Sequence, residues 1–421
     1  MENLVPMFQA FLGLGPTVIL PVFIFIIGLI FRCGPAKSFH SGLTIGVGFV
    51  GINLVVALLC DNLGPAAQAM IKNFGIQLNA IDIGWPGSAS MAWASPIAAF
   101  VLPLALVVNI IMLFTKTTKT MDVDIWNYWH FTFCGACVYA LTGSFWQAII
   151  AAIIFEIVVL KIADWTAPYM EKYFDLPGVS VPTGSTCSYA PLGIPLIWLI
   201  QKIPVIKNLK ADPDSIQKRF GIFGEPIFMG LFLGAVLGVL AGYSAGEVAK
   251  VGMAMAGVMV LMPRMVKLLM EGLIPISEAA RNVLQKRFGE NANIYIGLDA
   301  AVTTGHPAVI ATALILVPIT ILLAVILPGN NVLPFGDLAT IPFIVAMIVA
   351  AAHGNIVHSV LAGIVVISLS LLMSTAMAEF QTTMGVIANF KMPEGSTLIS
   401  SIDQAGNLIN FIIFKAFALF N

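Results

Sequence analysis

Long apolar stretches alternate with short polar ones over most of the 421-residue chain. A helix that crosses a bilayer needs about 20 mostly apolar residues. Stretches of about this length predict ten membrane-spanning helices, at residues 15–31, 42–60, 94–114, 125–141, 145–160, 226–243, 251–269, 307–327, 338–352 and 356–377. No Lys or Arg precedes the first stretch, so we expect it to stay in the mature protein rather than to be cleaved as a signal peptide.

Two further segments, residues 61–93 and 173–201, mix apolar residues with Gly, Pro and polar side chains. Irregular backbone is tolerated at membrane depth only where protein or a water-filled cavity satisfies its polar groups. We therefore interpret both segments as re-entrant or hairpin elements. Ordinary loops outside the membrane are the alternative interpretation.

The basic residues predict how the chain is oriented, because Lys and Arg concentrate in short cytoplasmic loops. They follow the first span, follow the third span, and recur between residues 161 and 219. These are the loops that would be cytoplasmic if the N-terminus were periplasmic. A second basic stretch, residues 264–287, predicts an amphipathic helix on the inner face.

Composition supports the membrane interpretation. Hydrophobic residues make up 59% of the chain and charged residues only 10%, against roughly 25% charged in soluble proteins. The formal net charge of −1 does not suit nucleic-acid binding. Cys134 and Cys137 form a C-x-x-C, but no second Cys or His pair stands at zinc spacing, so we expect no metal and no cofactor.

The chain also repeats itself. A near-constant offset of about 210 residues indicates an ancient duplication, and it relates four pairs of landmarks: Gly84 and Gly297, Pro96 and Pro307, Asp124 and Asp337, Gly143 and Gly354. Each copy has five spans, an odd number, so the copies should cross the membrane in opposite senses. Inverted repeats with interrupted helices are typical of carriers, whereas no filter ring or uniform pore lining suggests a channel.

The predicted fold class is therefore an all-α polytopic membrane protein with two inverted repeats of five transmembrane helices, re-entrant or hairpin elements and a C-terminal segment. We divide it into a first repeat (1–165), a hairpin insert with a basic cytoplasmic linker (166–219), a second repeat (220–378) and the C-terminal segment (379–421).

Six strings of the sequence resemble those of a known family. They are IGVGFVG (45–51), DNLGPAA (61–67), GWPGS (84–88), VDIWN (123–127), FGIFGEP (220–226) and LPFGDLATI (333–341). The chain resembles the galactitol-specific membrane component, IIC, of the bacterial sugar phosphotransferase system, a family related to the ascorbate-specific IIC proteins.

This resemblance implies a multi-pass homodimer in the bacterial inner membrane, with a core domain that carries the substrate and a second domain that holds the dimer. The polyol would be phosphorylated on the inner face by a phosphocysteine of a IIB protein, which is charged from phosphoenolpyruvate through a IIA protein. We expect IIA and IIB to be separate proteins. Cys33-Gly34-Pro35 lacks the strand–loop–helix context of a phosphate-binding loop, so this chain should carry no phosphorylated residue of its own.

Asp299 is the first candidate for the substrate site. It lies between Gly297 and Pro307 at a predicted helix break, and ionisable residues in membrane segments are costly and often functional. A carboxylate can accept hydrogen bonds from two vicinal hydroxyls of a polyol. The resemblance to the ascorbate proteins places an Asp at this position in the site, and a catalytic role as acceptor of the hydroxyl proton is a further hypothesis. The alternative is a helix-capping Asp.

His130 and Trp85 are the next candidates. His130 heads an apolar segment, and the related family has a substrate-binding His there, although the polar residue expected four positions later is Cys134 here. A satisfied core His is the alternative. Trp85, with Asp82 one turn away, occupies the first repeat's break, and an indole packs well on the C–H face of a sugar. A Trp of the interfacial belt is its alternative.

A hydroxyl-rich break, Thr183-Gly184-Ser185, completes the candidate substrate-binding set through the resemblance. The sequence thus predicts a IIC transporter that binds a polyol, most simply galactitol, and presents it to IIB by an elevator or rocking motion. The alternative is an ion-coupled secondary transporter of a small polar metabolite, which would need no partner protein.

Overall fold

The computed structural model describes residues 16–74, 78–122, 124–209, 211, 225–288, 294–304, 306–393 and 396–420. The protein is mostly helical, at 73%, and each of the ten predicted spans overlaps a helix. The helices are α2 (Pro16–Ile30), α3 (Pro35–Phe74), α4 (Gly84–Ala94), α5 (Ala98–Phe114), α6 (Tyr128–Thr142), α7 (Phe145–Phe174), α8 (Gly184–Cys187), α9 (Ala190–Ile200), α11 (Pro226–Leu240), α12 (Ala245–Phe288), α13 (Ala301–Thr304), α14 (Pro307–Ile326), α15 (Ile341–Ala351), α16 (Ile356–Ile387) and α17 (Leu408–Ala418), with 3₁₀ turns η1 (Ile125–Asn127) and η3 (Leu338–Thr340).

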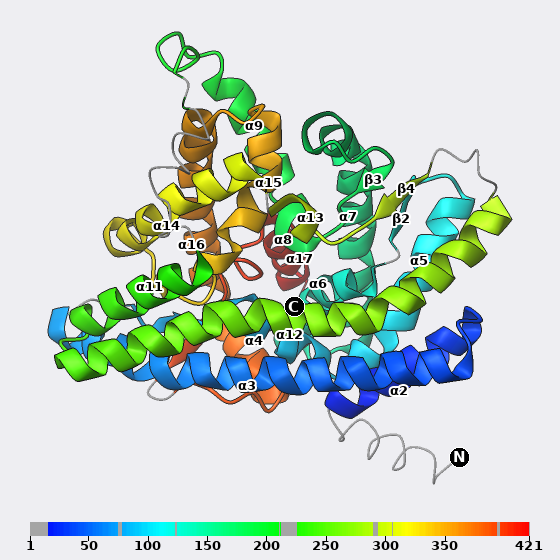
Figure 1. Cartoon of the computed structure of the whole chain (residues 1–421), viewed down its shortest axis with the longest axis horizontal. Coiled ribbons are helices and arrows are strands. Elements are labelled where there is room, and N and C mark those ends of the chain that lie inside the picture. The colour runs from blue at the N-terminus through cyan, green and yellow to red at the C-terminus, as the bar shows by residue number, and fades with distance from the viewer. Residues whose placement is uncertain are drawn as a thin grey trace.

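Helices α2, α3, α11 and α12 form a slab along one side of the molecule, and most of the other helices stand on it (Figure 1). Helix α3 has 40 residues and α12 has 44. At 1.5 Å per residue each is about 60 Å long or more, roughly twice the hydrocarbon thickness of a bilayer. The spans predicted at 42–60 and 251–269 are therefore only parts of longer helices.

Two boundaries predicted from the sequence are wrong for this reason. Residues 61–74 continue helix α3 and do not belong to a separate hairpin, and the basic stretch from residue 264 continues helix α12. Apolarity falls along each helix, and α3 continues even through Gly64 and Pro65, so a fall in apolarity does not mark where these helices end. Ser244 and Glu247 form a capping box at the start of α12, in which the Ser244 N–H and hydroxyl both donate to the Glu247 carboxylate.

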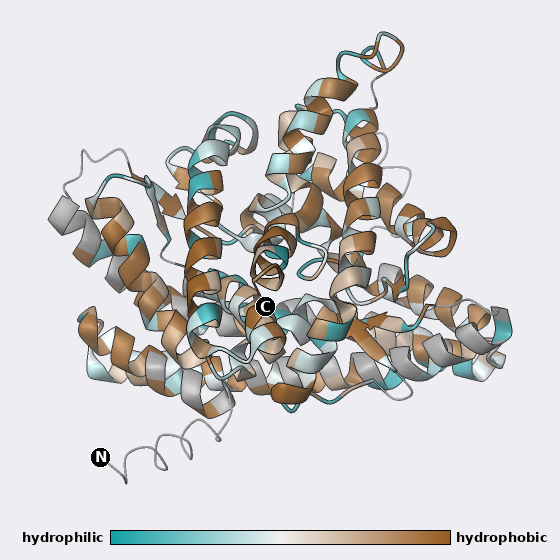
Figure 2. Ribbon diagram, turned by 180° about the vertical axis from the view of Figure 1, so that it is seen from behind, coloured by the Kyte–Doolittle hydropathy of each residue, from teal (hydrophilic) through white to brown (hydrophobic). Residues whose placement is uncertain are grey.

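Three described helices are long and apolar enough to cross a membrane: α7, α14 and α16. Helices α4 and α5 pass the same test together, but they are bent by 95° at the break between Ala94 and Ala98, so they form a fourth, broken span or a re-entrant loop. The other predicted spans stay predictions. Large apolar side chains also lie on the outside, for example Trp146, 72% exposed, and Leu54, 68% exposed, and Figure 2 shows apolar residues along most helices. Such a surface suits a lipid environment.

Two small parallel sheets, which an all-α prediction does not include, lie among the helices. One has the strand order β5-β1-β6 and the other β2-β4-β3. The strands are β1 (Ala80–Asp82), β2 (Thr120–Asp122), β3 (Val179–Ser180), β4 (Tyr295–Gly297), β5 (Val332–Leu333) and β6 (Leu398–Ser400). In the first sheet Asp82 pairs with Ser400, and in the second Gly297 pairs with Asp122. Each sheet therefore joins one half of the sequence to the other.

The two halves also cross in direct backbone contact just after strand β1. Gly84 has φ +73°, which favours glycine. A Cβ built on Gly336 would overlap the carbonyl oxygen of Asp82 and the nitrogen of Gly84. Glycine at these positions therefore allows two chain segments to pass each other where α4 begins.

Candidate functional site

Asp299 lies in the connection between strand β4 and helix α13. Its Oδ1 accepts a hydrogen bond from the backbone N–H of Ala301 at 2.8 Å, which is the capping contact of the alternative interpretation. The side chain is nevertheless only half-buried. Asp299 therefore caps a short helix and still has a surface that a ligand can reach.

Thr183 connects this segment to the first half of the chain. Its Oγ1 accepts a hydrogen bond from the backbone N–H of Ala300 at 2.8 Å and donates to Oδ1 of Asn127 at 2.9 Å. Thr183 is only 2% exposed. Its hydroxyl hydrogen and one lone pair are thus already used, and it serves to hold the Asp299 segment against η1.

His130, on helix α6, is 1% exposed, and both ring nitrogens have partners. Nδ1 lies 2.9 Å from the carbonyl oxygen of Asn127, and Nε2 lies 3.0 Å from Oγ of Ser185. Gly184 lies against the ring, because a Cβ at residue 184 would come within 2.6 Å of the His130 Cδ2 atom. The structure thus brings His130 and the Thr183–Ser185 loop together, but it leaves His130 no free polar atom in this conformation.

Three tryptophans form an aromatic cluster beside this histidine. The centroid distances are 6.1 Å for Trp85 and Trp126, 6.4 Å for Trp85 and Trp129, and 6.2 Å for Trp126 and Trp129. The Trp129 ring also lies 3.9 Å from the His130 ring. Trp85 is the partly exposed member, and it is therefore the one that can pack on a ligand.

Asp82 is fully buried, and its carboxylate accepts hydrogen bonds from two backbone N–H groups, those of Gly84 at 2.9 Å and Asp337 at 2.8 Å. Asp337 in turn accepts from the backbone N–H of Trp85 at 2.6 Å and from the Ser401 hydroxyl at 2.6 Å. Both carboxylates therefore hold the start of helix α4, and with it Trp85, in place. All seven candidate residues belong to one contiguous group.

Sequence reasoning missed the part of this group that comes from residues 401–407. Asp403 and Gln404 are fully buried and bonded to Ser185. A signal existed, because Ser-Ser-Ile-Asp-Gln-Ala-Gly-Asn (400–407) is a polar run between two apolar ones. The domain division predicted from the sequence places this run in the C-terminal segment, apart from the Thr183–Ser185 break.

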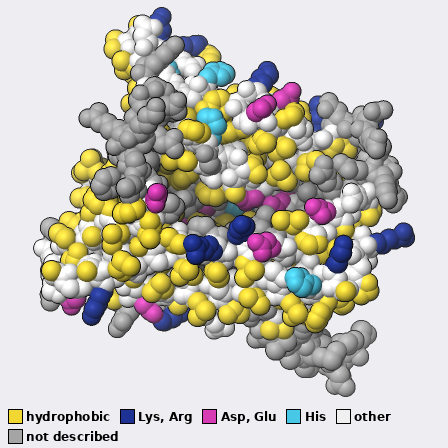
Figure 3. All heavy atoms as spheres, in the orientation of Figure 1, with side chains coloured by type: hydrophobic (Ala, Val, Ile, Leu, Met, Phe, Trp, Pro, Cys, Tyr) yellow, Lys and Arg dark blue, Asp and Glu magenta, His cyan; other side chains and the backbone are white. Residues whose placement is uncertain are grey.

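The electrostatic character of the site is acidic. Asp124 accepts a hydrogen bond from the backbone N–H of Trp126 at 3.1 Å, and its charge lies close enough to act on that of Asp299. Within the described ranges, ion pairs join only Lys161 to Asp164 and Lys391 to Asp61, residues outside this group. Figure 3 shows acidic side chains around a hollow at the centre of the face crossed by α12, with Lys or Arg side chains beside them. Hydroxyl, amide and carboxyl groups beside indole rings suit an uncharged, hydroxyl-rich ligand.

Comparison with known proteins identifies the family. Residues 10–395 match the family model of the sugar-specific permease component of the phosphotransferase system, EIIC-GAT. The chain belongs to this family. It is 42% identical over 407 residues, 97% of this chain and 90% of the relative, to the galactitol-specific EIIC component of Escherichia coli K12. A putative permease IIC component of the same organism is 40% identical, over 98% of this chain and 94% of the relative.

The protein is thus an integral membrane permease component of the phosphotransferase system. An EIIC component works with separate IIA and IIB components. The family does not favour the ion-coupled secondary transporter that was the alternative. The match confirms the resemblance found in the six strings of the sequence.

Proposed function

We propose that this protein carries a hexitol across the bacterial inner membrane and presents it for phosphorylation. Galactitol is the substrate that we propose. The observation that carries the proposal is the 42% identity to a galactitol-specific relative over 97% of the chain. The composition of the site supports it. A hexitol has six hydroxyls and no charge, and the described side chains that form the group around Asp299 offer hydroxyl, amide and carboxyl groups and include no Lys or Arg.

In this proposal Asp299 accepts hydrogen bonds from two neighbouring hydroxyls of the polyol, and Trp85 packs on its C–H face. The partial exposure of both side chains supports these roles. Gly184 lets the His130 ring pack directly on the backbone of the Thr183–Ser185 loop. Asp82, Thr183 and His130 would contribute mainly by holding these groups in place.

The phosphoryl donor is a phosphocysteine on the IIB partner. Positioning and electrostatic stabilisation supply most of the catalysis in phosphoryl transfer. The carboxylate that binds the reacting hydroxyl also stands where it can accept the proton of that hydroxyl. Asp299 is therefore the catalytic residue that we propose in this chain, and the covalent phosphoryl intermediate belongs to IIB.

The chain is built, in this proposal, from two inverted repeats. The strand orders β5-β1-β6 and β2-β4-β3 support it. If β1, β2 and β3 of the first half correspond to β4, β5 and β6 of the second, replacing each strand by its counterpart converts one order into the other. Pairs of elements that correspond in order, such as α2 with α11 and α3 with α12, support it as well. The same correspondence pairs β3 and α9 with β6 and α17. The repeats then extend over residues 16–200 and 226–418, and the hairpin insert and C-terminal segment become their last parts.

We also propose a homodimer with a periplasmic N-terminus. The slab of α2, α3, α11 and α12 is the domain that would hold the dimer, and apolar side chains such as Leu54 and Val239 lie exposed on it. The basic residues after the first span, Arg32 and Lys37, support the orientation. The group formed around Asp299 would then move across the membrane against this slab.

The test uses the purified chain in proteoliposomes with labelled galactitol. Labelled galactitol phosphate should form only when phosphoenolpyruvate, the general phosphotransferase proteins, IIA and IIB are all present on the IIB side. An uncoupler should not affect it. Uptake that needs no phosphoenolpyruvate and collapses with an uncoupler would instead establish the ion-coupled transporter. A thermal-shift series with other polyols ranks the substrates, since a ligand that binds only the native state raises its melting temperature.

A further inference from the structure

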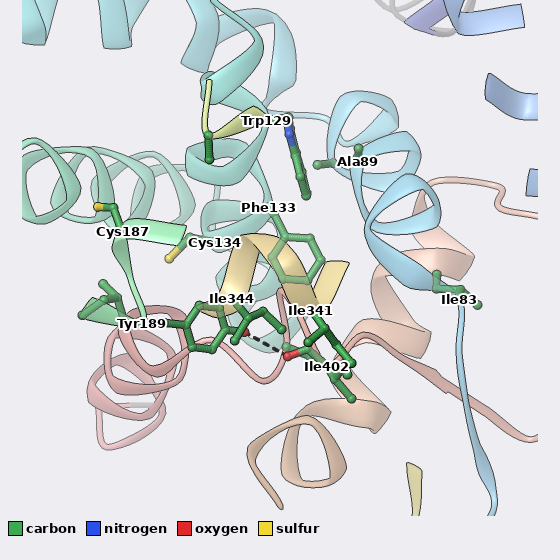
Figure 4. Close-up of a cluster of buried hydrophobic side chains, with 14 of the residues drawn as sticks. Ile83, Ala89, Trp129, Phe133, Cys134, Cys187, Tyr189, Ile341, Ile344 and Ile402 are labelled. Atoms are coloured by element: carbon green, nitrogen blue, oxygen red, sulfur yellow. Dashed lines mark hydrogen bonds between the residues drawn. The ribbon is translucent and has the colours of Figure 1, made fainter. Parts of the chain in front are cut away.

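Two loops from opposite halves of the chain meet beside the proposed substrate site. One comprises residues 183–189, after strand β3, and the other residues 401–407, after strand β6. The Tyr189 hydroxyl lies 3.0 Å from the carbonyl oxygen of Ile402, the contact drawn in Figure 4, and 2.7 Å from that of Asp403. The Tyr189 side chain therefore fixes its own loop to the backbone of the other loop.

Ser185 is the centre of those polar side chains. Its hydroxyl oxygen lies 2.6 Å from Oδ2 of Asp403 and 3.0 Å from Nε2 of His130, and it accepts a hydrogen bond from Nε2 of Gln404 at 3.1 Å. Gln404 also donates to Oδ2 of Asp403 at 2.7 Å. Each of these four side chains is at most 5% exposed. Protein groups, rather than bulk water, thus determine where their hydrogens lie.

The position of one hydrogen on the His130 imidazole follows from the partner of Nδ1, the nitrogen that does not face Ser185. Nδ1 of His130 lies 2.9 Å from the backbone carbonyl oxygen of Asn127. A carbonyl oxygen only accepts hydrogen bonds, so Nδ1 must carry a hydrogen. Whether Nε2 also carries a hydrogen then depends on Ser185 and Asp403.

Two arrangements of hydrogens satisfy the line from His130 to Asp403. In the first, doubly protonated His130 donates from Nε2 to Ser185, and Ser185 donates to ionised Asp403. In the second, Ser185 donates to Nε2 of neutral His130, and protonated Asp403 donates to Ser185. Both contain the same number of protons and differ only by a shift along the line, and in both the line has no net charge.

We propose that Asp403 is a positioning residue of the substrate site, which acts through Ser185 and shares one proton with His130. The inference rests on the proposed function, in which the group around His130 holds the substrate. The Asn127 carbonyl fixes the tautomer of the imidazole, and the shared proton fixes the contact of its Nε2 with Ser185. It also joins a loop of the C-terminal half to helix α6 of the N-terminal half, at the point where the ring packs on Trp129.

A purely space-filling role does not account for an acid at position 403. The side chain is fully buried, its Oδ1 has no hydrogen-bond partner among the described residues, and its own backbone N–H donates to the carboxylate of Asp337. A buried carboxylate without a cation is costly. A shared proton offsets that cost, whereas an amide at the same place would avoid the cost altogether.

The first test is nitrogen NMR of the full-length protein in lipid, labelled with ¹⁵N at histidine, with the His130 signals identified by their loss in His130→Gln. In the unsubstituted protein Nδ1 should be protonated and Nε2 should show a shared hydrogen. Asp403→Asn removes the acidic proton, so Nε2 should move to the position of an unprotonated acceptor while Nδ1 stays protonated. Asp403→Glu should restore the shared signal. An unprotonated Nδ1, or a Nε2 signal that Asp403→Asn does not move, would overturn the proposal.

The second test measures galactitol phosphorylation with the IIA and IIB partners. Asp403→Asn and Ser185→Ala should each lower kcat/KM by about tenfold or more, and the double variant should be no worse than the single ones, because all of them break the same line. Asp61→Asn, at an exposed Asp whose ion pair with Lys391 lies outside the group around Asp299, is the matched control. If the losses in kcat/KM of the two single variants multiply in the double variant, the two residues act independently, which contradicts the proposed line from His130 to Asp403. If the unsubstituted protein phosphorylates no polyol, the proposed function fails, but the NMR result still decides the proton sharing.

Discussion

At the scale of single residues, Asp299 combines two tasks that can be separated. Its Oδ1 caps helix α13 through the N–H of Ala301, and its half-exposed carboxylate is available to a ligand. Asn is also a good helix cap, so Asp299→Asn should keep the fold and remove only the charge.

Asp299→Asn should weaken galactitol binding roughly tenfold to a hundredfold, because hydrogen bonds to a charged group contribute about 1.5–3 kcal/mol. If Asp299 also accepts the hydroxyl proton, kcat should fall as well. Binding and phosphorylation assays measure the two effects separately. Asp61→Asn is the control, since among the described residues it breaks only the exposed ion pair with Lys391, worth about 1 kcal/mol at most. Unchanged affinity and rate in Asp299→Asn would remove this residue from the site.

Gly184 makes a second prediction at this scale. A methyl group there would overlap the His130 ring, which is fixed at both nitrogens and cannot turn away freely. Gly184→Ala should therefore lower the melting temperature and the galactitol affinity together, at a cost of about 1–3 kcal/mol for overpacking. In the control Gly246→Ala, none of the described residues lies within 4 Å of the new methyl group, so the melting temperature should be unchanged or slightly raised. Equal behaviour of the two variants contradicts the packing described here.

At the scale of elements, the crossing of residues 82–84 and 334–337 determines where helix α4 begins. Gly336→Ala places a methyl group against the backbone of both Asp82 and Gly84, and backbone, unlike the end of a side chain, cannot give way locally. We expect a loss of about 1–3 kcal/mol in thermal unfolding, with reduced binding because Trp85 moves. Gly257→Ala is the control within an apolar helix, since among the described residues its methyl group would meet only Leu58, at 3.8 Å. A Gly336→Ala protein as stable as Gly257→Ala would show that the crossing is looser than described.

These elements also explain which parts of the fold the sequence could predict. An apolar run such as residues 145–160 is long enough to reveal a helix by itself. Strand β5, Val332–Leu333, has two residues, too few to display an alternating pattern. The extension of α3 to Phe74 could not be predicted, because apolarity falls after residue 60 and Gly64 and Pro65 indicate a helix end that the structure does not have.

For the site, the sequence could predict single candidate residues but not the contacts between distant loops. Asp299, Trp85 and His130 stand out because polar or aromatic residues near predicted breaks are uncommon. That His130 reaches Ser185, and Ser185 reaches Asp403, depends on how distant loops cross in space. Asp403 is 218 positions from Ser185, and no local pattern encodes such a contact. Only the polar composition of residues 400–407 pointed to it.

At the scale of the whole molecule, the inverted repeat is the claim on which the transport mechanism depends. Helices α3 and α12 begin at Pro35 and Ala245, and their second residues, Ala36 and Gly246, are both exposed. If the repeats are inverted, these two equivalent positions must face opposite sides of the membrane. The basic residues nearby predict that Ala36 is cytoplasmic, and hence that Gly246 is periplasmic.

Single cysteines test this directly. In a background with Cys33 and Cys60 replaced by Ser, Gly246→Cys should react with a membrane-impermeant maleimide in intact spheroplasts, and Ala36→Cys only after permeabilisation. The remaining cysteines, Cys134, Cys137 and Cys187, are buried and serve as the unreactive background. Labelling of both new cysteines from the same side would contradict the inverted repeat. Opposite labelling with the sides exchanged would keep the repeat but place the N-terminus in the cytoplasm, on the same side as the IIB partner.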